Sequence, residues 1–322
     1  MKKLNSVIVS AIFIASAFSF YQCTNDEELF DGFETEPEFY SLQEVHESLT
    51  QNDTIEFSIT DPTVDNELEG AQGVRVFFPA NAFVDDEGNT ITEGPLTVKL
   101  IEVFKRGDMI RHNIQTYASE DPLVSGGMFW LAVSDANGDE VAFSGTEATL
   151  PYQTDATGYE YAMQYFTGTT QTAPSGPVIS WGVNQAEFLF DESAGENGEF
   201  TIWEILGGWS NCDAFYDLLT DGATQFSVKV TNVVDYTNTQ IFFALDDFST
   251  IASLNTVDGD ALVTYTESIP VGATGKIIAI SLVDGELQLA SQDVTIAGDD
   301  VFELQVQSAT IIDLESLLTS ID

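Results

Sequence analysis

The sequence predicts an all-β protein with two β-sandwich domains, which follow a flexible N-terminal tether and end in a short C-terminal helix. From residue 54 onward, apolar and polar residues alternate with period two, which is typical of half-buried strands. Gly- and Asp-rich turns separate these segments without an interleaved helical pattern, and this favours sandwiches over a parallel α/β sheet. Hydrophobic residues make up 43 % of the chain, so we expect packed cores, and disorder does not explain the acidic composition.

Residues 1–22 have the features of a signal peptide. Lys2 and Lys3 form a positive start, and the apolar run over residues 7–20 is short for a hydrocarbon core of roughly 30 Å. No later stretch approaches the apolar length of a transmembrane helix. One cleavage site, Ala15-Ser16-Ala17, would release a soluble secreted protein. The competing site lies just before Cys23 and would give a lipoprotein.

Residues 20–23 form the candidate lipobox, Phe20-Tyr21-Gln22-Cys23, in which the Cys23 thiol is lipidated and becomes the mature N-terminus. The tetrapeptide departs from the usual Leu-small-small-Cys, but the polar, acidic stretch that follows suits a flexible lipidated tether over residues 23–50. Residues 41–51 could form a brief helix. The first acidic residues after Cys23 are Asp26, Glu27 and Glu28, and they resemble the surface-export signal of Bacteroidota lipoproteins. Acyl chains anchor by about 0.8 kcal/mol per buried methylene, so we expect a lipid anchor in the outer membrane, with the body at the cell surface.

The charge balance is strongly acidic, with 9 Lys and Arg against 53 Asp and Glu and a net charge of −44. Such a surface repels nucleic acid and anionic lipid headgroups, so binding to either by charge is excluded. Two explanations of the acidity stay open. The carboxylates either keep the protein soluble or gather to bind divalent cations.

The first predicted sandwich covers residues 51–152. Its clearest strands alternate around Ile55-Phe57-Ile59, Val74-Val76-Phe78 and Leu96-Val98-Leu100. The segment of residues 73–83 resembles the strand and Pro-x-x-Ala signature of the ZU-five-type β-domain of ankyrins and netrin receptors. Its sequence is Gly-Val-Arg-Val-Phe-Phe-Pro-Ala-Asn-Ala-Phe. Further matches to that pattern lie at Leu96-Thr97-Val98, at residues 122–127 and at residues 148–151. Domains of similar appearance occur in Bacteroidota surface lipoproteins, often with a downstream stretch like residues 208–213, Gly-Trp-Ser-Asn-Cys-Asp.

The resemblance implies an interaction module, and therefore binding without catalysis. Some members of that family cleave themselves at a His-Phe-Ser sequence. This chain has Ala142-Phe143-Ser144 instead, which lacks the histidine that would activate the serine. We therefore do not expect self-cleavage.

Residues 153–199 are predicted to be a connector with some strands, and residues 200–322 an Ig-like or transthyretin-like sandwich. The second body shows six or seven period-two segments between residues 226 and 308. Residues 311–321 place apolar side chains at helical spacing, which predicts a short amphipathic C-terminal helix that packs on the core or on a partner.

Catalytic residue types are scarce, and we expect no enzyme. His46 and His112 are the only histidines, one near the flexible N-terminus and the other in a basic cluster whose field disfavours an imidazolium. Two histidines and one free cysteine, Cys212, are too few ligands for a closed tetrahedral zinc site without carboxylates. With Cys23 lipidated, Cys212 also has no partner for an intramolecular disulfide. The many carboxylates do not exclude a glycosidase-type acid and base pair by count.

Calcium is the one cofactor that the sequence suggests. Asp135, Asn137 and Asp139 resemble the start of a calcium loop, although no acid stands at the twelfth position. The alternative is an ordinary hairpin turn, as also predicted for residues 85–89.

Two further groups could bind a partner. Lys105, Arg106 and Arg111 belong to the one basic cluster of an acidic chain, predicted in a loop, and either dock an anionic partner or pair with nearby carboxylates. The four tryptophans could stack on sugars or could pack in the core, and they are Trp130, Trp181, Trp203 and Trp209. An exposed row of them would favour a glycan, and burial of all four would count against it.

These features predict a non-catalytic binding or scaffolding subunit of a membrane protein complex, with an outer-membrane protein as partner. The alternative is a surface lipoprotein that binds a polysaccharide for nutrient uptake.

Overall fold

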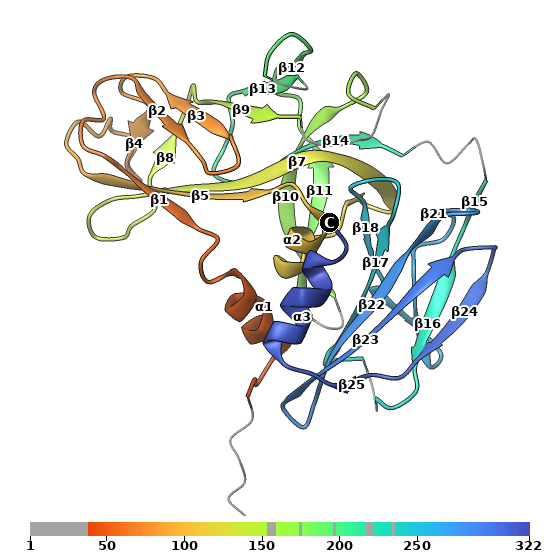
Figure 1. Cartoon of the computed structure of the whole chain (residues 1–322). Helices are drawn as coiled ribbons and strands as arrows, with labels where there is room; N and C mark the ends of the chain where they lie inside the picture. Colours follow the sequence, from red (N-terminus) through yellow and green to blue (C-terminus); the bar gives the residue numbers. More distant parts are fainter. Residues whose placement is uncertain (1–37, 153–158, 174–175, 196–197, 217–221, 234–235) are drawn as a thin grey trace, which may run out of the picture. The chain divides into compact units, whose positions relative to one another are not determined.

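The computed structural model describes residues 38–322, except for 153–158, 174–175, 196–197, 217–221 and 234–235. This part of the chain is nearly all β, with several sheets and a short C-terminal helix, which confirms the predicted fold class (Figure 1). No helix among these residues combines the length and the apolar composition needed to cross a bilayer.

Two main sheets and one small sheet form the first sandwich. The larger sheet has the order β1-β5-β7-β14-β10-β11, with β6 beside β7, and the smaller has the order β12-β13-β9-β3-β2. The strands of the larger sheet are β1 (Ile55–Ile59), β5 (Leu96–Val103), β6 (Tyr117–Ala118), β7 (Asp121–Ser134), β10 (Gln164–Ala173), β11 (Gly176–Val183) and β14 (Gly208–Phe215). Those of the smaller sheet are β2 (Asn66–Glu69), β3 (Arg75–Phe78), β9 (Glu147–Pro151), β12 (Phe188–Asp191) and β13 (Glu199–Trp203), while β4 (Phe83–Val84) pairs with β8 (Ala142–Phe143).

The second sandwich contains a five-stranded sheet, β18-β17-β22-β23-β25, and a four-stranded sheet, β19-β20-β16-β24. The five-stranded sheet consists of β17 (Thr239–Leu245), β18 (Ile251–Ser253), β22 (Thr274–Val283), β23 (Glu286–Thr295) and β25 (Gln307–Ser308). The four-stranded sheet consists of β16 (Phe226–Val230), β19 (Thr256–Asp258), β20 (Ala261–Val263) and β24 (Asp300–Leu304), and β15 (Ala223–Thr224) pairs with β21 (Ile269–Pro270). The pair β16 and β24 is parallel, whereas the other pairs in these sheets are antiparallel.

The sheet pairing differs from the predicted boundary near residue 200. Strands β10 and β11 lie in the predicted connector, yet they extend the larger sheet of the first sandwich. Strands β13 and β14, predicted to open the second sandwich, pair with β9 and β7 of the first. Backbone hydrogen bonds to strands much earlier in the chain decide this assignment, and local composition does not reveal them.

The described part of the chain contains three helices: α1 (Leu42–Thr50), α2 (Arg106–Arg111) and α3 (Ile311–Thr319). The Ser41 side chain caps α1 by accepting from the Glu44 amide at 3.2 Å, and Thr310 with Asp313 forms a capping box at α3. The helix α3 matches the predicted C-terminal helix. The helix α1 agrees with the brief helix predicted over residues 41–51. It occupies the last part of the predicted tether, because its apolar side chains at positions 42, 45 and 49 form one buried face.

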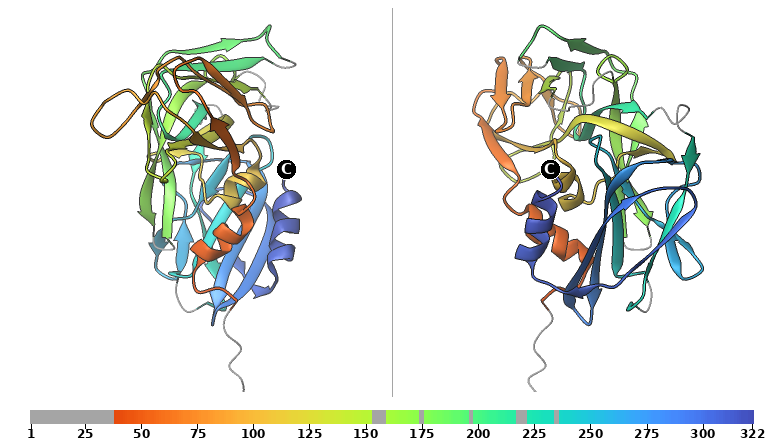
Figure 2. Two further views of the ribbon diagram at one scale, coloured as in Figure 1. Left: turned by 90° about the vertical axis from the view of Figure 1, so that its left-hand side faces the viewer. Right: turned by 45° about the vertical axis from the view of Figure 1, so that its right-hand side comes forward.

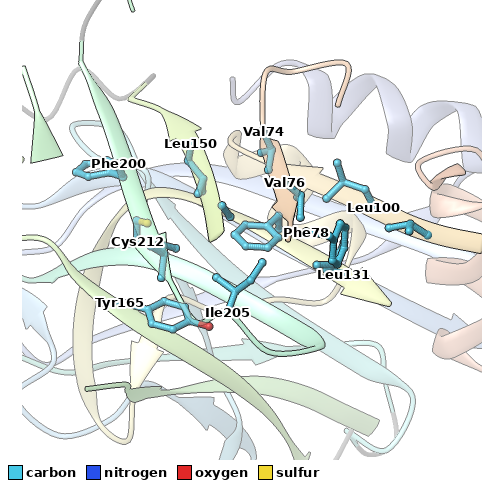
Figure 3. Packing of buried hydrophobic residues seen from close by; sticks show 14 of the residues in the cluster. Val74, Val76, Phe78, Leu100, Leu131, Leu150, Tyr165, Phe200, Ile205 and Cys212 are labelled. Atoms are coloured by element: carbon cyan, nitrogen blue, oxygen red, sulfur yellow. The ribbon is translucent and has the colours of Figure 1, made fainter. Parts of the chain in front are cut away.

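Buried apolar residues form three clusters. The first fills the first sandwich, where the inner residues of β3, β5, β7 and β9 meet those of β14 (Figure 3). The second fills the other sandwich, around Phe226, Phe243 and Ile277. The third joins the outer face of the larger sheet to strands β17 and β22, and includes residues of all three helices. The helices contact one another beside these strands (Figures 1 and 2).

Candidate functional site

A cleft of about 440 Å³ lies where segments from four distant parts of the chain meet. Its walls come from α1, the end of α2, the β10–β11 hairpin and the start of β17. Both histidines of the chain line it, together with Arg111 and several amide and hydroxyl side chains. The volume falls in the range of about 300–1,000 Å³ that is typical of small-molecule sites. We name this feature the α1 cleft.

His46 is a buried residue of the cleft lining. It lies on the inner face of α1, its Nδ1 is 2.9 Å from the Arg111 carbonyl oxygen, and its Nε2 is 2.6 Å from Gln240 Oε1. A carbonyl can only accept, so Nδ1 carries the proton. In the neutral ring Nε2 then accepts, and the Gln240 amide must turn its NH₂ group toward it. Burial lowers the pKa of His46 below its ordinary value, which favours this neutral form.

His112 follows Arg111 and contacts the segment after α1 and strand β14. Its Nε2 is 3.2 Å from Asp53 Oδ2, and its ring packs edge-on against Trp209 with centroids 5.7 Å apart. The sequence predicts His46 near the flexible N-terminus and His112 within a basic cluster. His46 is fixed in a helix, and the carboxylate of Asp53 stands beside His112.

Asn113 supplies an unsatisfied acceptor at the cleft wall. Its backbone has a left-handed φ of 52°, which Asn adopts more readily than most residues. Its Nδ2 donates to the Pro177 carbonyl oxygen at 2.7 Å and ties the end of α2 to the β10–β11 hairpin. Its Oδ1 is buried and has no hydrogen-bond partner among the described residues. A donor group that reached this atom from the cleft would satisfy it.

The predicted basic docking segment forms α2 and does not form a loop. Arg106 donates to the Leu245 carbonyl oxygen, and Arg111 Nε lies 3.6 Å from Asp108 Oδ1. Two of the three predicted docking cations therefore contact groups of the fold, while Lys105 is exposed at the start of the helix. Burial and the nearby carboxylate of Asp322 raise the pKa of Asp108.

The four tryptophans neither form an exposed row nor are all buried. Trp181 is buried and donates from Nε1 to the Gln115 carbonyl oxygen at 2.7 Å. Trp130, Trp203 and Trp209 are half-buried, and Trp130 faces Trp209 directly across strands β7 and β14. None of the four is an exposed platform, and only one is fully buried.

The candidate calcium loop closes a hairpin turn. Asp135 Oδ1 accepts from the amides of Asn137 and Asp139 at 2.8 and 3.0 Å, and Asp135 Oδ2 accepts from Asn137 Nδ2 at 3.0 Å. These hydrogen bonds lower the pKa of Asp135. Within the described ranges, no group of three or more Asp, Glu, His or Cys side chains is placed to hold a metal ion.

Cys212 belongs to the buried core of the first sandwich, and its neighbour Asp213 is also buried, at a register shift between β14 and β7. Burial raises the pKa of the Cys212 thiol well above its ordinary value, so the thiolate is disfavoured. Burial likewise raises the pKa of Asp213, whose Oδ2 accepts from Asn211 Nδ2 at 2.6 Å. Neither group lines the α1 cleft.

The anchor and export residues lie outside the described residues; they are Cys23, Asp26, Glu27 and Glu28. The α1 cleft itself was not predicted. The spacing of Leu42, Val45, His46 and Leu49 could have indicated a buried His46, because these positions share one helix face. Nothing in the sequence indicates its partner Gln240, which lies 194 residues away.

Comparisons of this chain with protein-family models, with curated proteins and with solved structures found no match.

Proposed function

We propose that this protein is a lipoprotein of the outer membrane, anchored through Cys23 with its body at the cell surface, and that it acts by binding without catalysis. The anchor rests on the signal peptide and lipobox of residues 1–23 and on the acidic run that follows. The binding role rests on the α1 cleft, which is the observation that carries the proposal.

The surroundings of His46 and Cys212 support binding over catalysis. His46 has both ring nitrogens hydrogen-bonded to groups of the fold, and the Cys212 thiol is buried in the core. A nucleophile and its base must lie within hydrogen-bond reach of each other. The hydrogen-bond partners of His46 are a backbone carbonyl and a side-chain amide, which cannot serve as nucleophiles.

The size of the cleft favours a small ligand, or the end of a polymer, over a large docking surface. A second candidate function is a subunit of a complex with an outer-membrane protein. The exposed Lys105 favours it, since a cation at the start of α2 is unusual in a chain of net charge −44.

A comparison of wild type with a cleft-blocking variant tests the proposal. Thr170 is an exposed residue of the cleft wall on β10, so Thr170→Trp fills the entrance, and Gln171→Trp on the opposite face of the same strand is the control. Each tagged full-length protein is purified in mild detergent from its own membranes, and everything bound is identified by mass spectrometry. We expect a ligand with wild type and Gln171→Trp that Thr170→Trp lacks. Identical results for all three would contradict a role for the cleft.

A further inference from the structure

We infer that the α1 cleft takes a neutral, hydroxyl-rich ligand, namely the end of a saccharide. This inference rests on the proposed function, in which the cleft is the binding site, and adds the chemical class of what is bound. It follows from the charge of the site, its hydrogen-bonding groups and its apolar floor.

Arg111 and His112, which line the cleft, each lie beside a carboxylate of the fold. Arg111 Nε is 3.6 Å from Asp108 Oδ1, and His112 Nε2 is 3.2 Å from Asp53 Oδ2. Glu47 is an exposed carboxylate of the cleft wall that accepts from Gln43 Nε2 at 2.8 Å. A charged ligand would have to break one of these pairs or stand beside it, and the net charge of −44 adds a repulsion for anions. A neutral ligand avoids both costs.

The hydrogen-bonding groups of the cleft match hydroxyls. Asn113 Oδ1 is a buried acceptor without a partner among the described residues, and it needs a donor. The walls add the amides of Gln43 and Asn238 and the hydroxyl of Thr170, which can both donate and accept. A sugar hydroxyl also donates and accepts, so neighbouring hydroxyls of one ring can satisfy such a wall without any charge.

The floor and the volume suit a sugar ring. Leu42, Pro177 and Ile179 present apolar surface to the cleft and can pack against the C–H face of a ring. A cleft of about 440 Å³ has room for a monosaccharide or a disaccharide and not for a long stretch of polymer. A longer glycan would therefore enter by its end.

Calorimetric titration of the full-length protein in detergent tests the inference with three groups of probes. The neutral group contains maltose, lactose and cellobiose, the anionic group contains galacturonate and glucose 6-phosphate, and spermidine is the cation. We expect at least one neutral sugar to bind and the charged probes not to bind. Binding of charged probes alone, or of no neutral sugar, overturns the inference.

Two variant pairs locate the binding. Asn113→Gly removes the free acceptor while keeping a residue that tolerates positive φ, and Ser119→Gly is its control because Ser119 is exposed, outside the cleft, and has a φ of 58°. We expect Asn113→Gly to weaken sugar binding about tenfold, the value of one hydrogen bond, and Ser119→Gly to leave it unchanged.

Thr170→Trp should abolish sugar binding and Gln171→Trp should not, with melting curves confirming that both variants fold. Sugar binding that survives Thr170→Trp places the sugar elsewhere and overturns the inference. A third outcome separates the inference from the proposed function. If no neutral sugar binds, but the wild type retains a membrane partner that Thr170→Trp loses, the inferred ligand class is wrong and the proposed binding function stands.

Discussion

At the scale of single residues, two buried ionisable groups respond to pH in opposite directions. Burial raises the pKa of Asp213 and lowers the pKa of His46, because the low-dielectric interior disfavours the charged form of each. The folded state therefore binds a proton more tightly at Asp213 and less tightly at His46 than the unfolded chain does. Each difference contributes a slope to the dependence of stability on pH.

The Asp213 slope can be isolated with Asp213→Asn. In the wild type, the contribution of Asp213 is present at low pH and is lost as pH rises from its ordinary pKa of 3.8 toward the higher folded value. The slope reaches at most about 1.4 kcal/mol per pH unit. We expect the free energy of unfolding of the wild type, measured by urea denaturation, to fall from pH 4 to pH 8 because of this contribution. In Asp213→Asn this part of the fall should be absent. Parallel curves for the two proteins would show that Asp213 ionises normally.

The neutral His46 predicts a specific response to Gln240→Glu. A carboxylate in place of the amide, at the 2.6 Å contact with Nε2, stabilises the imidazolium and should raise the pKa of His46 above its ordinary 6.5. Proton NMR titration measures this directly, since the chain has only two histidines and His112→Gln assigns the signals. In wild type the His46 signal should titrate below 6.5, so this residue lowers stability as pH falls through that range. A pKa that Gln240→Glu leaves unchanged would mean that His46 does not contact this side chain.

At the scale of elements, strands could be predicted from the sequence more readily than the short helix α2. Alternation around Ile55, Val76 and Val98 predicted strands that the structure places at β1, β3 and β5, because one buried face imposes period two on the side chains. Helix α2 has only 6 residues, too few for a helical pattern, and depends on tertiary contacts. Gly107 allows one of them, because its amide donates to Asp322 Oδ1 at 2.8 Å and its Cα lies against the backbone of α3.

Gly107→Ala tests this close approach of α2 and α3. A Cβ at residue 107 would overlap the Leu318 carbonyl oxygen, which belongs to backbone and cannot rotate away. We expect a loss of about 1–3 kcal/mol in the free energy of unfolding, the usual cost of overpacking. Gly182→Ala is the matched control, since a Cβ there meets no atom within 4 Å, and should change stability by less than about 0.5 kcal/mol. Equal effects in chemical denaturation would show that α2 and α3 do not need the glycine.

At the scale of the whole molecule, composition and period-two alternation predicted the fold class, whereas long-range pairing determined how the sheets and the α1 cleft are assembled. The α1 cleft requires α1, α2, the β10–β11 hairpin and β17 to meet, and their contacts span up to 194 residues, as between His46 and Gln240. A single sequence shows which segments have an apolar face, and it does not show which faces meet. For the same reason the boundary between the sandwiches was placed too early, before β13 and β14.

The lipid anchor, in contrast, is predicted from the sequence alone, and the variant Cys23→Ser tests it. A lipidated N-terminus sends a protein into the detergent phase of a phase-separation assay, because the buried acyl methylenes contribute about 0.8 kcal/mol each. We expect wild type in the detergent phase and Cys23→Ser, without the thiol that accepts the lipid, in the aqueous phase at the size of the precursor. Cys212→Ala is the control, since the other cysteine of the chain is buried in the first sandwich and should not affect partitioning. If cleavage instead follows Ala15-Ser16-Ala17, wild type and Cys23→Ser will both be aqueous and will share a mature N-terminus upstream of residue 23. That outcome would make the protein a soluble secreted one and remove the membrane anchor from the proposed function.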